Sequence, residues 1–450
     1  MSSALSPAPA TLRSLLTLAW PIVLSRASQT IIGLSDTLLV AHLGKSALAA
    51  TATGALNALT VLMLPLGISF IVQSFSAQLH ARGDAAGARR FGWYGLLLAA
   101  LTQLGCLAVW PHIDGVLQHL PYEPEVRTLM GGYLRIRLLS GGAAVGIEAL
   151  SSYFGGLGRT RPGMVASVAA MVLNVLGNWL LIDGHFGLPA MGVEGSALAS
   201  TLAALAAFVG FFLYFVVQGP RVSLSPREFL RMLRYGIPEG FNWFFEFGSF
   251  VFFTNVVMAS LGTAALAAMN SVLSINSLSF MPAFGLASAG AILVGQAIGA
   301  GEKDAVPRIL WLTVRAAVCW QAAVGTLCLL FPHALISLFA EGEGGLEVAH
   351  IGARMLRVAV AWAVFDACAM TLTEALRGAG DTFVPMMARI ALAWLLFAPG
   401  SYVSVHFFGW EAVPALSWIV LHLGALALTL FVRFRLGAWR RITLVEPAPG

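Results

Sequence analysis

Charged side chains are scarce in this sequence. Only 10% of its 450 residues are Asp, Glu, Lys or Arg, whereas 58% are hydrophobic. A soluble globular domain carries about 25% charged residues, so this chain has too few to cover a surface in water. The deficit excludes an ordinary soluble domain and predicts the lipid bilayer as the partner that surrounds the chain.

Cysteines are also few, and metal-binding motifs are lacking. The cysteines lie singly in apolar runs, at Cys106, Cys319, Cys328 and Cys368, without metal-ligand spacing. No nucleophile is paired with a base in an enzyme-like pattern, so we expect neither an enzyme nor a bound cofactor. The first dozen residues lack a basic segment followed by a short apolar core and a cleavage site, so we expect no cleavable signal peptide.

Long uncharged runs are what the sequence does contain. A helix needs about 20 apolar residues to cross the hydrocarbon core, and six runs meet that length: 91–113, 162–182, 196–218, 316–340, 390–410 and 412–432. The uncharged stretch 46–81 predicts one long helix kinked at Pro65. The stretch 247–301 is too long for one span, and Leu261-Gly262-Thr263 predicts the turn that divides it. Four spans carry charges, at 15–40, 130–157, 229–260 and 351–376. Because the span 229–260 includes the first part of the divided stretch, the total is twelve.

The distribution of Lys and Arg predicts the orientation. If both termini are cytoplasmic, seventeen basic residues fall in cytoplasmic segments and two, Lys45 and Arg127, fall in the opposite loops. Such a bias is typical of positive-inside topology. We therefore expect a multi-pass protein of the cell inner membrane with both termini in the cytoplasm. The net charge of +5 follows from these topology determinants, so we expect no nucleic-acid partner.

The two halves of the chain repeat each other. Leu43-Gly44 before Ala47-Leu48-Ala49-Ala50 matches Leu261-Gly262 before Ala265-Leu266-Ala267-Ala268, and Gly156-Leu157-Gly158 matches Gly378-Ala379-Gly380. Six spans in each half give both halves the same topology, which predicts an all-α membrane protein of two six-helix lobes related by a pseudo-two-fold axis along the membrane normal. The predicted parts are a cytoplasmic tail (1–13), the N-terminal lobe (14–218), a cytoplasmic linker (219–226), the C-terminal lobe (227–437) and a second tail (438–450).

Acidic residues inside the spans are few and segregated. A charge at mid-membrane costs at least about 2.5 kcal/mol and is usually functional. The acids lie on the first, fourth, seventh and tenth spans: Asp36, Glu148, Glu239, Glu246, Asp366 and Glu374. Asn174 and Asn178 are spaced to share one helix face. Such a pair more often joins helices, but beside Asp36 we interpret it as part of a cation or proton site. Candidates for a substrate cavity are Asp36, Gln29, Arg26, Asn242 and Asn270.

Together these residues resemble the multidrug and toxic compound extrusion (MATE) family, in its NorM-type branch, over nearly the whole chain. The resemblance rests on the order and spacing of several segments: Pro21 through Asp36-Thr37, Asn174 with Asn178, Gly192-Val193-x-Gly195-x-Ala197-x-Ala199, Gly236-Ile237-Pro238 with Phe245-Glu246, and Asp366 eleven residues before Arg377-Gly378. One departure is Asn270, where family members often carry Gln.

The resemblance implies a secondary antiporter that works by alternating access between the lobes. Such proteins export amphipathic, mostly cationic small molecules in exchange for inward sodium or protons. Family members bind coupling ions at acids matching Glu246 and Asp366, which would be the metal ligands if the ion is sodium. They also use an acid matching Asp36, with polar residues matching Asn174 and Asn178. We expect a monomer.

Two rival transporters fit parts of the pattern. A flippase for a lipid-linked oligosaccharide would need a basic central cavity, for which Arg26 is the only deep candidate. A major-facilitator carrier also has six plus six spans, but its loop pattern fits the second half less well. Carboxylates bind both sodium and protons, so both coupling ions remain alternatives.

Overall fold

The computed structural model describes residues 10–119, 122–220, 222–339 and 345–445, and every regular element in these ranges is a helix. In this part of the chain, ten helices are long and apolar enough to cross a membrane. Two further predicted spans are present as the pair α5–α6, whose members are short, and as α9, whose first turns are charged. The prediction of an all-helical membrane protein with twelve spans is confirmed.

The chain forms two compact units. The first consists of Leu24–Gly240, and the second contains the described residues from Phe241 onward together with residues 10–23. The helix α1 therefore begins in the second unit, where Leu15 and Leu18 join its hydrophobic core, and continues into the first. The predicted bounds of the lobes, linker and tails in the membrane remain predictions.

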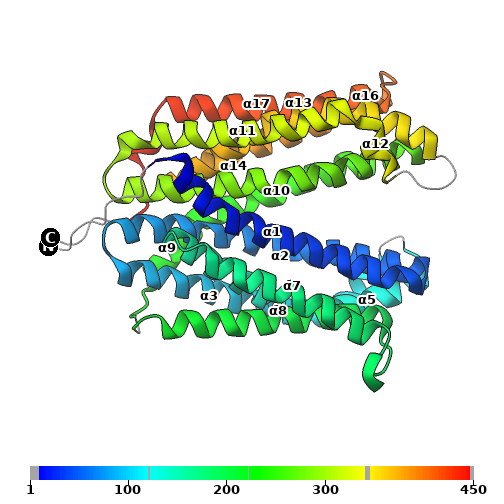
Figure 1. The fold of residues 1–450 in the computed structure, drawn as a ribbon, viewed down its shortest axis with the longest axis horizontal. Coiled ribbons are helices and arrows are strands. Elements are labelled where there is room, and N and C mark those ends of the chain that lie inside the picture. Colours follow the sequence, from blue (N-terminus) through cyan, green and yellow to red (C-terminus); the bar gives the residue numbers. More distant parts are fainter. Residues whose placement is uncertain (1–9, 120–121, 221, 340–344, 446–450) are drawn as a thin grey trace. The chain divides into compact units, whose positions relative to one another are not determined.

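In the first unit, α6 packs against α2 and α3, and α7 packs against α8. Figure 1 shows α2, α3, α7 and α8 running alongside one another, coloured from blue to green. The helices of this half are α1 (Leu12–Val40), α2 (Lys45–Ala81), α3 (Ala85–Val109), α4 (Ile113–Leu117), α5 (Pro124–Leu138), α6 (Gly141–Gly156), α7 (Arg161–Ile182) and α8 (Gly192–Val217).

In the second unit, α13 is central and packs against α10, α11 and α17, which Figure 1 colours from green to red. The helices of this half are α9 (Pro226–Phe252), η4 (Phe253–Met258), α10 (Thr263–Gly299), α11 (Val306–Leu330), α12 (Pro332–Ser337), α13 (Gly345–Ala379), α14 (Phe383–Ala391), η6 (Leu392–Phe397), α15 (Ala398–His406), α16 (Ala412–Ala415), α17 (Ser417–Arg435) and η7 (Ala438–Arg441).

Matching helices of the two repeats have matching lengths and starts. The helices α2 and α10 both contain 37 residues, and α3 and α11 both contain 25. Gly44 precedes α2 with φ +113°, and Gly262 precedes α10 with φ +102°, a region that glycine adopts readily and other residues avoid. The turn predicted at Leu261-Gly262-Thr263 is confirmed, and the same backbone device opens the second helix of each repeat.

The fourth predicted span is not one helix. The prediction of a continuous span over 130–157 is corrected, because α5 ends at Leu138 and α6 begins at Gly141. The side chain of Gln103, on α3, bridges the break: its Nε2 donates to the Leu138 carbonyl (3.2 Å) and its Oε1 accepts from the Gly142 N–H (2.9 Å). Backbone groups freed inside a membrane must find partners within the protein, and Gln103 supplies them.

Two π-helical segments mark the second unit. The helix α9 continues into η4, and α14 continues into η6 before α15 begins. The rings of Phe253 and Phe397, one from each π-helical segment, lie with centroids 5.2 Å apart, and both side chains are fully buried. Single-turn π-helices are rare and frequently accompany functional sites.

Candidate functional site

In the first unit, Asp36 lies in a network of neutral donors from two other helices. Its Oδ1 accepts hydrogen bonds from the Nδ2 atoms of Asn174 (2.9 Å) and Asn178 (2.7 Å), both on α7. Its Oδ2 accepts from the hydroxyl of Ser200 on α8 (2.7 Å), and Asn174 also donates to Ser200 (2.8 Å). All four residues are buried. The structure thus brings together the three residues predicted for this lobe and adds Ser200.

This network stabilises a carboxylate without neutralising it. Among the described residues, no Lys, Arg or His nitrogen forms an ion pair with Asp36. Hydrogen bonds to an ionised group are roughly twice as strong as neutral ones, so three of them can hold an anion in a buried place. The Oδ1 of Asn178 is buried without a hydrogen-bond partner. A carboxylate with a spare amide oxygen beside it is suited to receive a small cation or a proton.

Ser200 was missed by the reasoning from sequence. It lies among small residues of α8, where a serine is usually explained by close helix packing. A signal was present: Ser196 and Ser200 are spaced by four residues, as are Asn174 and Asn178.

In the second unit, Glu246 and a buried arginine form a second charged cluster. Arg389, on α14, forms an ion pair with Glu246 on α9 and is 4% exposed. Its Nε donates to the Oδ1 of Asn242 (2.8 Å), and its Nη2 lies 3.5 Å from the hydroxyl of Thr373. Asp366, on α13, is half-buried. The structure therefore joins Glu246 with Asn242 through Arg389, whereas no ion pair joins Asp366 to this arginine among the described residues.

Arg389 was also missed. The predicted eleventh span starts at residue 390, directly after Arg389, and therefore leaves Arg389 outside the membrane. The structure begins α14 at Phe383, which places Arg389 inside the span. The matching helix α7 begins directly after Thr160, and this start could have shown that the eleventh span begins after Thr382.

The comparisons with known proteins agree with this architecture. The family model MatE matches residues 21–180 and 238–403, one segment in each half of the chain. The chain belongs to the MatE family. As a member of this family of transporters, it is a transporter and not an enzyme, as predicted. Bacterial relatives of the NorM type also match over nearly the whole chain, which confirms the predicted branch.

Two such relatives carry the description "Probable multidrug resistance protein NorM". The protein from Pseudomonas putida is 31% identical over 98% of this chain and 97% of its own length. The protein from Mesorhizobium japonicum is 30% identical over 97% of this chain and 95% of its own. Among solved structures, an outward-facing multidrug resistance MATE family transporter of the MOP superfamily has a TM-score of 0.86 and 21% identity over 96% of this chain and 97% of its own. That likeness supports the MatE fold.

Two remaining acids of this MatE protein have arginine partners. Arg26 on α1 makes a bidentate pair with Glu148 on α6 (2.8 and 2.7 Å), and its Nη1 also donates to Gln29 (3.2 Å). Glu374 pairs with Arg377 one turn later on α13, with both side chains almost fully buried. Two predicted cavity residues, Arg26 and Gln29, therefore lie together, but Arg26 is engaged by a carboxylate.

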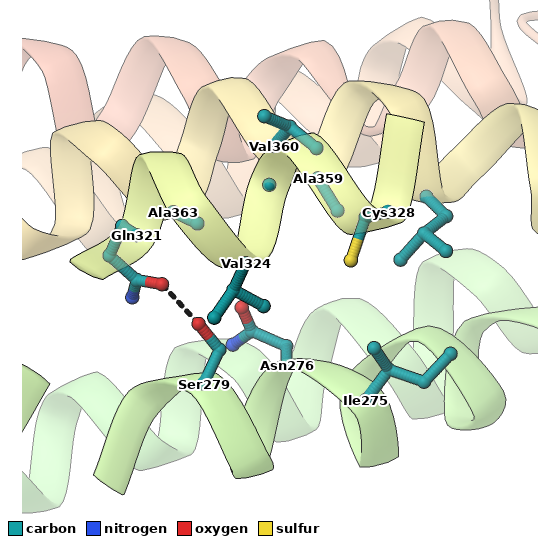
Figure 2. A pocket seen from close by; sticks show the side chains of 11 residues that line it. Ile275, Asn276, Ser279, Gln321, Val324, Cys328, Ala359, Val360 and Ala363 are labelled. Atoms are coloured by element: carbon teal, nitrogen blue, oxygen red, sulfur yellow. Dashed lines mark hydrogen bonds between the residues drawn. The ribbon is translucent and has the colours of Figure 1, made fainter. Parts of the chain in front are cut away.

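The last predicted cavity residue lies apart from both clusters. Asn270 is exposed on α10, and among the described residues no hydrogen bond joins its side chain to either carboxylate site. A small cavity does adjoin α10, between α11 and α13, with a volume of about 20 Å³. Figure 2 shows the hydrogen bond between Ser279 and Gln321 at one end and Cys328 toward the other. That volume holds about one water molecule, so it is not a drug site.

Proposed function

We propose that this MatE protein is a secondary antiporter that exports amphipathic, mostly cationic drugs in exchange for inward sodium or protons. The observation that carries the proposal is the Asp36 network, in which a buried carboxylate accepts hydrogen bonds from three neutral donors and has no basic partner among the described residues. Binding of a cation there changes the charge of a buried site. That change can bias a two-state equilibrium between access states.

The second coupling site in this proposal is formed by Glu246 and Asp366. Asp36, with Asn174 and Asn178, supplies the first site and contributes to substrate binding. The transporter works as a monomer in the inner membrane, with both termini in the cytoplasm. The substrate path lies between the predicted lobes and is opened to alternate sides of the membrane. The printed descriptions of the NorM relatives support drug efflux for this chain.

The chemistry around Asp36 accommodates either ion. Sodium requires several oxygen ligands, which the carboxylate, the Ser200 hydroxyl and the amide oxygens of Asn174 and Asn178 can provide once the amides turn their oxygens inward. A proton requires only the carboxylate. The flippase alternative is not favoured, because Arg26, the deep cation that a pyrophosphate would need, is engaged by Glu148.

Ethidium efflux from a pump-deficient bacterial strain tests the proposal. We expect the wild-type chain to extrude ethidium, and we expect both Asp36→Asn and Glu246→Gln to abolish efflux at equal membrane levels, checked by immunoblot. Assays with sodium replaced by choline, and with the external pH varied, identify the coupling ion. A well-expressed wild type that does not extrude ethidium would contradict the proposal and favour a different transported molecule.

A further inference from the structure

The first turns of α9 extend beyond the length of helix that the hydrocarbon of a membrane can surround. The helix contains 27 residues, which corresponds to about 40 Å, and η4 continues it. The hydrocarbon core of a bilayer is only about 30 Å thick. All three arginines of α9 lie within its first nine residues, so we expect this end of the helix to reach the layer of lipid headgroups.

One face of this segment is fixed to α3 within the first unit. The carboxylate of Glu228 accepts two hydrogen bonds from Arg90 (2.8 and 3.1 Å) and one from the hydroxyl of Tyr94 (2.8 Å). The N–H of Ser225, directly before the helix, donates to the same hydroxyl (2.8 Å). Met232, one turn after Glu228, is fully buried. These contacts determine which face of α9 is turned away from the protein.

The outward face combines the three arginines with exposed apolar side chains. Arg227, Arg231 and Arg234 are spaced by four and three residues, so they share one side of the helix. Leu230 and Ile237 alternate with these arginines along the same side and are 64% and 40% exposed. Arg227 and Arg234 are also exposed, and neither forms an ion pair with a described residue. This surface therefore offers both positive charge and apolar area to a ligand.

Such a combination suits the headgroup and the upper acyl chains of an anionic phospholipid. Guanidinium groups bind phosphate through two parallel hydrogen bonds, and clusters of basic residues beside a membrane span attract anionic lipids. A soluble anion such as phosphate or a nucleic acid would leave Leu230 and Ile237 in water. A lipid at the membrane surface covers the charge and the apolar side chains together.

The first helix of the other repeat lacks this set of charges. Pro21 of α1 matches Pro238 of α9, and the three arginines lie eleven, seven and four residues before Pro238. The residues at the same distances before Pro21 are Ala10, Ser14 and Thr17. One arginine, Arg13, remains in this part of α1, where α9 has Leu230. The three charges are therefore not required to begin the first helix of a repeat.

We propose that the first turns of α9 form a binding site for an anionic phospholipid of the surrounding membrane. Its phosphate contacts Arg227, Arg231 and Arg234, and its acyl chains lie beside Leu230 and Ile237. The site uses none of the carboxylates assigned to ion coupling, so it goes beyond the proposed function. Because the opposite face of the segment is already fixed to α3, the lipid binds a surface that is formed before it arrives.

Lipid binding to the purified protein tests the proposal. The protein is delipidated in a neutral detergent, and native mass spectrometry measures its affinity for phosphatidylglycerol and for phosphatidylcholine with the same acyl chains. The test variant, Arg227→Ala/Arg231→Ser/Arg234→Thr, carries the matching residues of the first repeat. The wild type should bind phosphatidylglycerol at least about tenfold more tightly than phosphatidylcholine, and the test variant should lose at least about tenfold in affinity for phosphatidylglycerol alone.

A control variant removes the same number of charges elsewhere. Arg308→Ala/Arg435→Ala/Arg441→Ala replaces three exposed arginines on α11, α17 and η7. It should keep the affinity of the wild type for phosphatidylglycerol within about threefold, because its arginines lie outside the site. Glycerol phosphate, which carries the negative charge without acyl chains, should not displace phosphatidylglycerol from the wild type at equal concentration.

The melting temperature of each variant without added lipid shows whether it is folded. If the triple test variant does not fold, the two exposed arginines are replaced singly. Arg227→Ala and Arg234→Thr should then each lower the affinity for phosphatidylglycerol at least about threefold. Equal affinities of the test variant and the wild type, or an equal loss in the control variant, would overturn the site. Displacement by glycerol phosphate at equal concentration would also overturn it, in favour of a site for soluble phosphate compounds.

Discussion

Replacing Ser200 with alanine removes one of the three donors that hold Asp36. The wild-type hydroxyl donates to Oδ2 of the carboxylate at 2.7 Å, and both side chains are buried. A hydrogen bond to a charged group contributes about 1.5–3 kcal/mol. The variant therefore destabilises the cation-free carboxylate by about that amount, and each 1.4 kcal/mol changes an affinity about tenfold.

The direction of the effect identifies the coupling ion. If the ion is a proton, Ser200→Ala should bind it about 10- to 150-fold more tightly, because the competing anionic state has lost a donor. Half-maximal efflux should then need a correspondingly lower proton concentration, and ion release should slow. If the ion is sodium, the variant loses an oxygen ligand, so the half-saturating sodium concentration should rise.

The assay is ethidium efflux as a function of external pH and of sodium, at equal membrane levels of each variant. Ser196→Ala is the matched control: it lies one turn earlier on α8, is equally buried, and its hydroxyl has no hydrogen-bond partner among the described atoms. We expect this control to keep the wild-type ion dependence. If Ser200→Ala and Ser196→Ala show the same dependence of efflux on pH and the same dependence on sodium, the Ser200 hydroxyl does not stabilise the Asp36 carboxylate.

Two further predictions concern stability, measured as thermal unfolding of purified protein in detergent. Gln103→Leu should destabilise the chain by about 1–3 kcal/mol, because the break between α5 and α6 loses two hydrogen bonds in the membrane. Thr102→Ala is its control, since that hydroxyl bonds only its own helix, and equal melting temperatures would contradict the bridging role. Arg26→Leu should cost about 3–5 kcal/mol by leaving Glu148 unpaired, and Arg26→Leu/Glu148→Leu should recover most of it. A double variant no more stable than the single one would show that the pair is not coupled.

Much of the fold could be predicted because the membrane imposes simple rules. Uncharged runs of the right length became helices, and Gly262 ended one and began the next because its positive φ suits glycine. The break between α5 and α6 could not be predicted in this way. Ser140-Gly141-Gly142 at the break contains helix-breaking residues, but a rule based on the length of apolar runs takes no account of them. The residue that stabilises the interruption, Gln103, belongs to another helix, and a tertiary partner of this kind leaves no local signal.

The sites were predictable to a similar degree. Carboxylates stand out in an apolar sequence, and Asn174 and Asn178 could be assigned to Asp36 because their spacing places both on one face. Ion pairing was less visible, since Arg26 and Glu148 are 122 residues apart in the chain. Charge composition shows that such acids need partners. Glu374 finds Arg377 on its own helix, but only the packing of helices selects the arginines that pair with Glu148 and Glu246.

That selection separates the membrane acids that have an arginine partner from those that have none. Of the acids inside the predicted spans, three have an arginine partner: Glu148, Glu246 and Glu374. Asp36 and Asp366 have none among the described residues, one in each unit. A paired acid changes its charge only if its partner also moves, whereas an unpaired one can bind and release a cation within a fixed structure. The surroundings of the two acids also differ, because three neutral donors bind Asp36 in the first unit, whereas the buried arginine of the second unit pairs with Glu246.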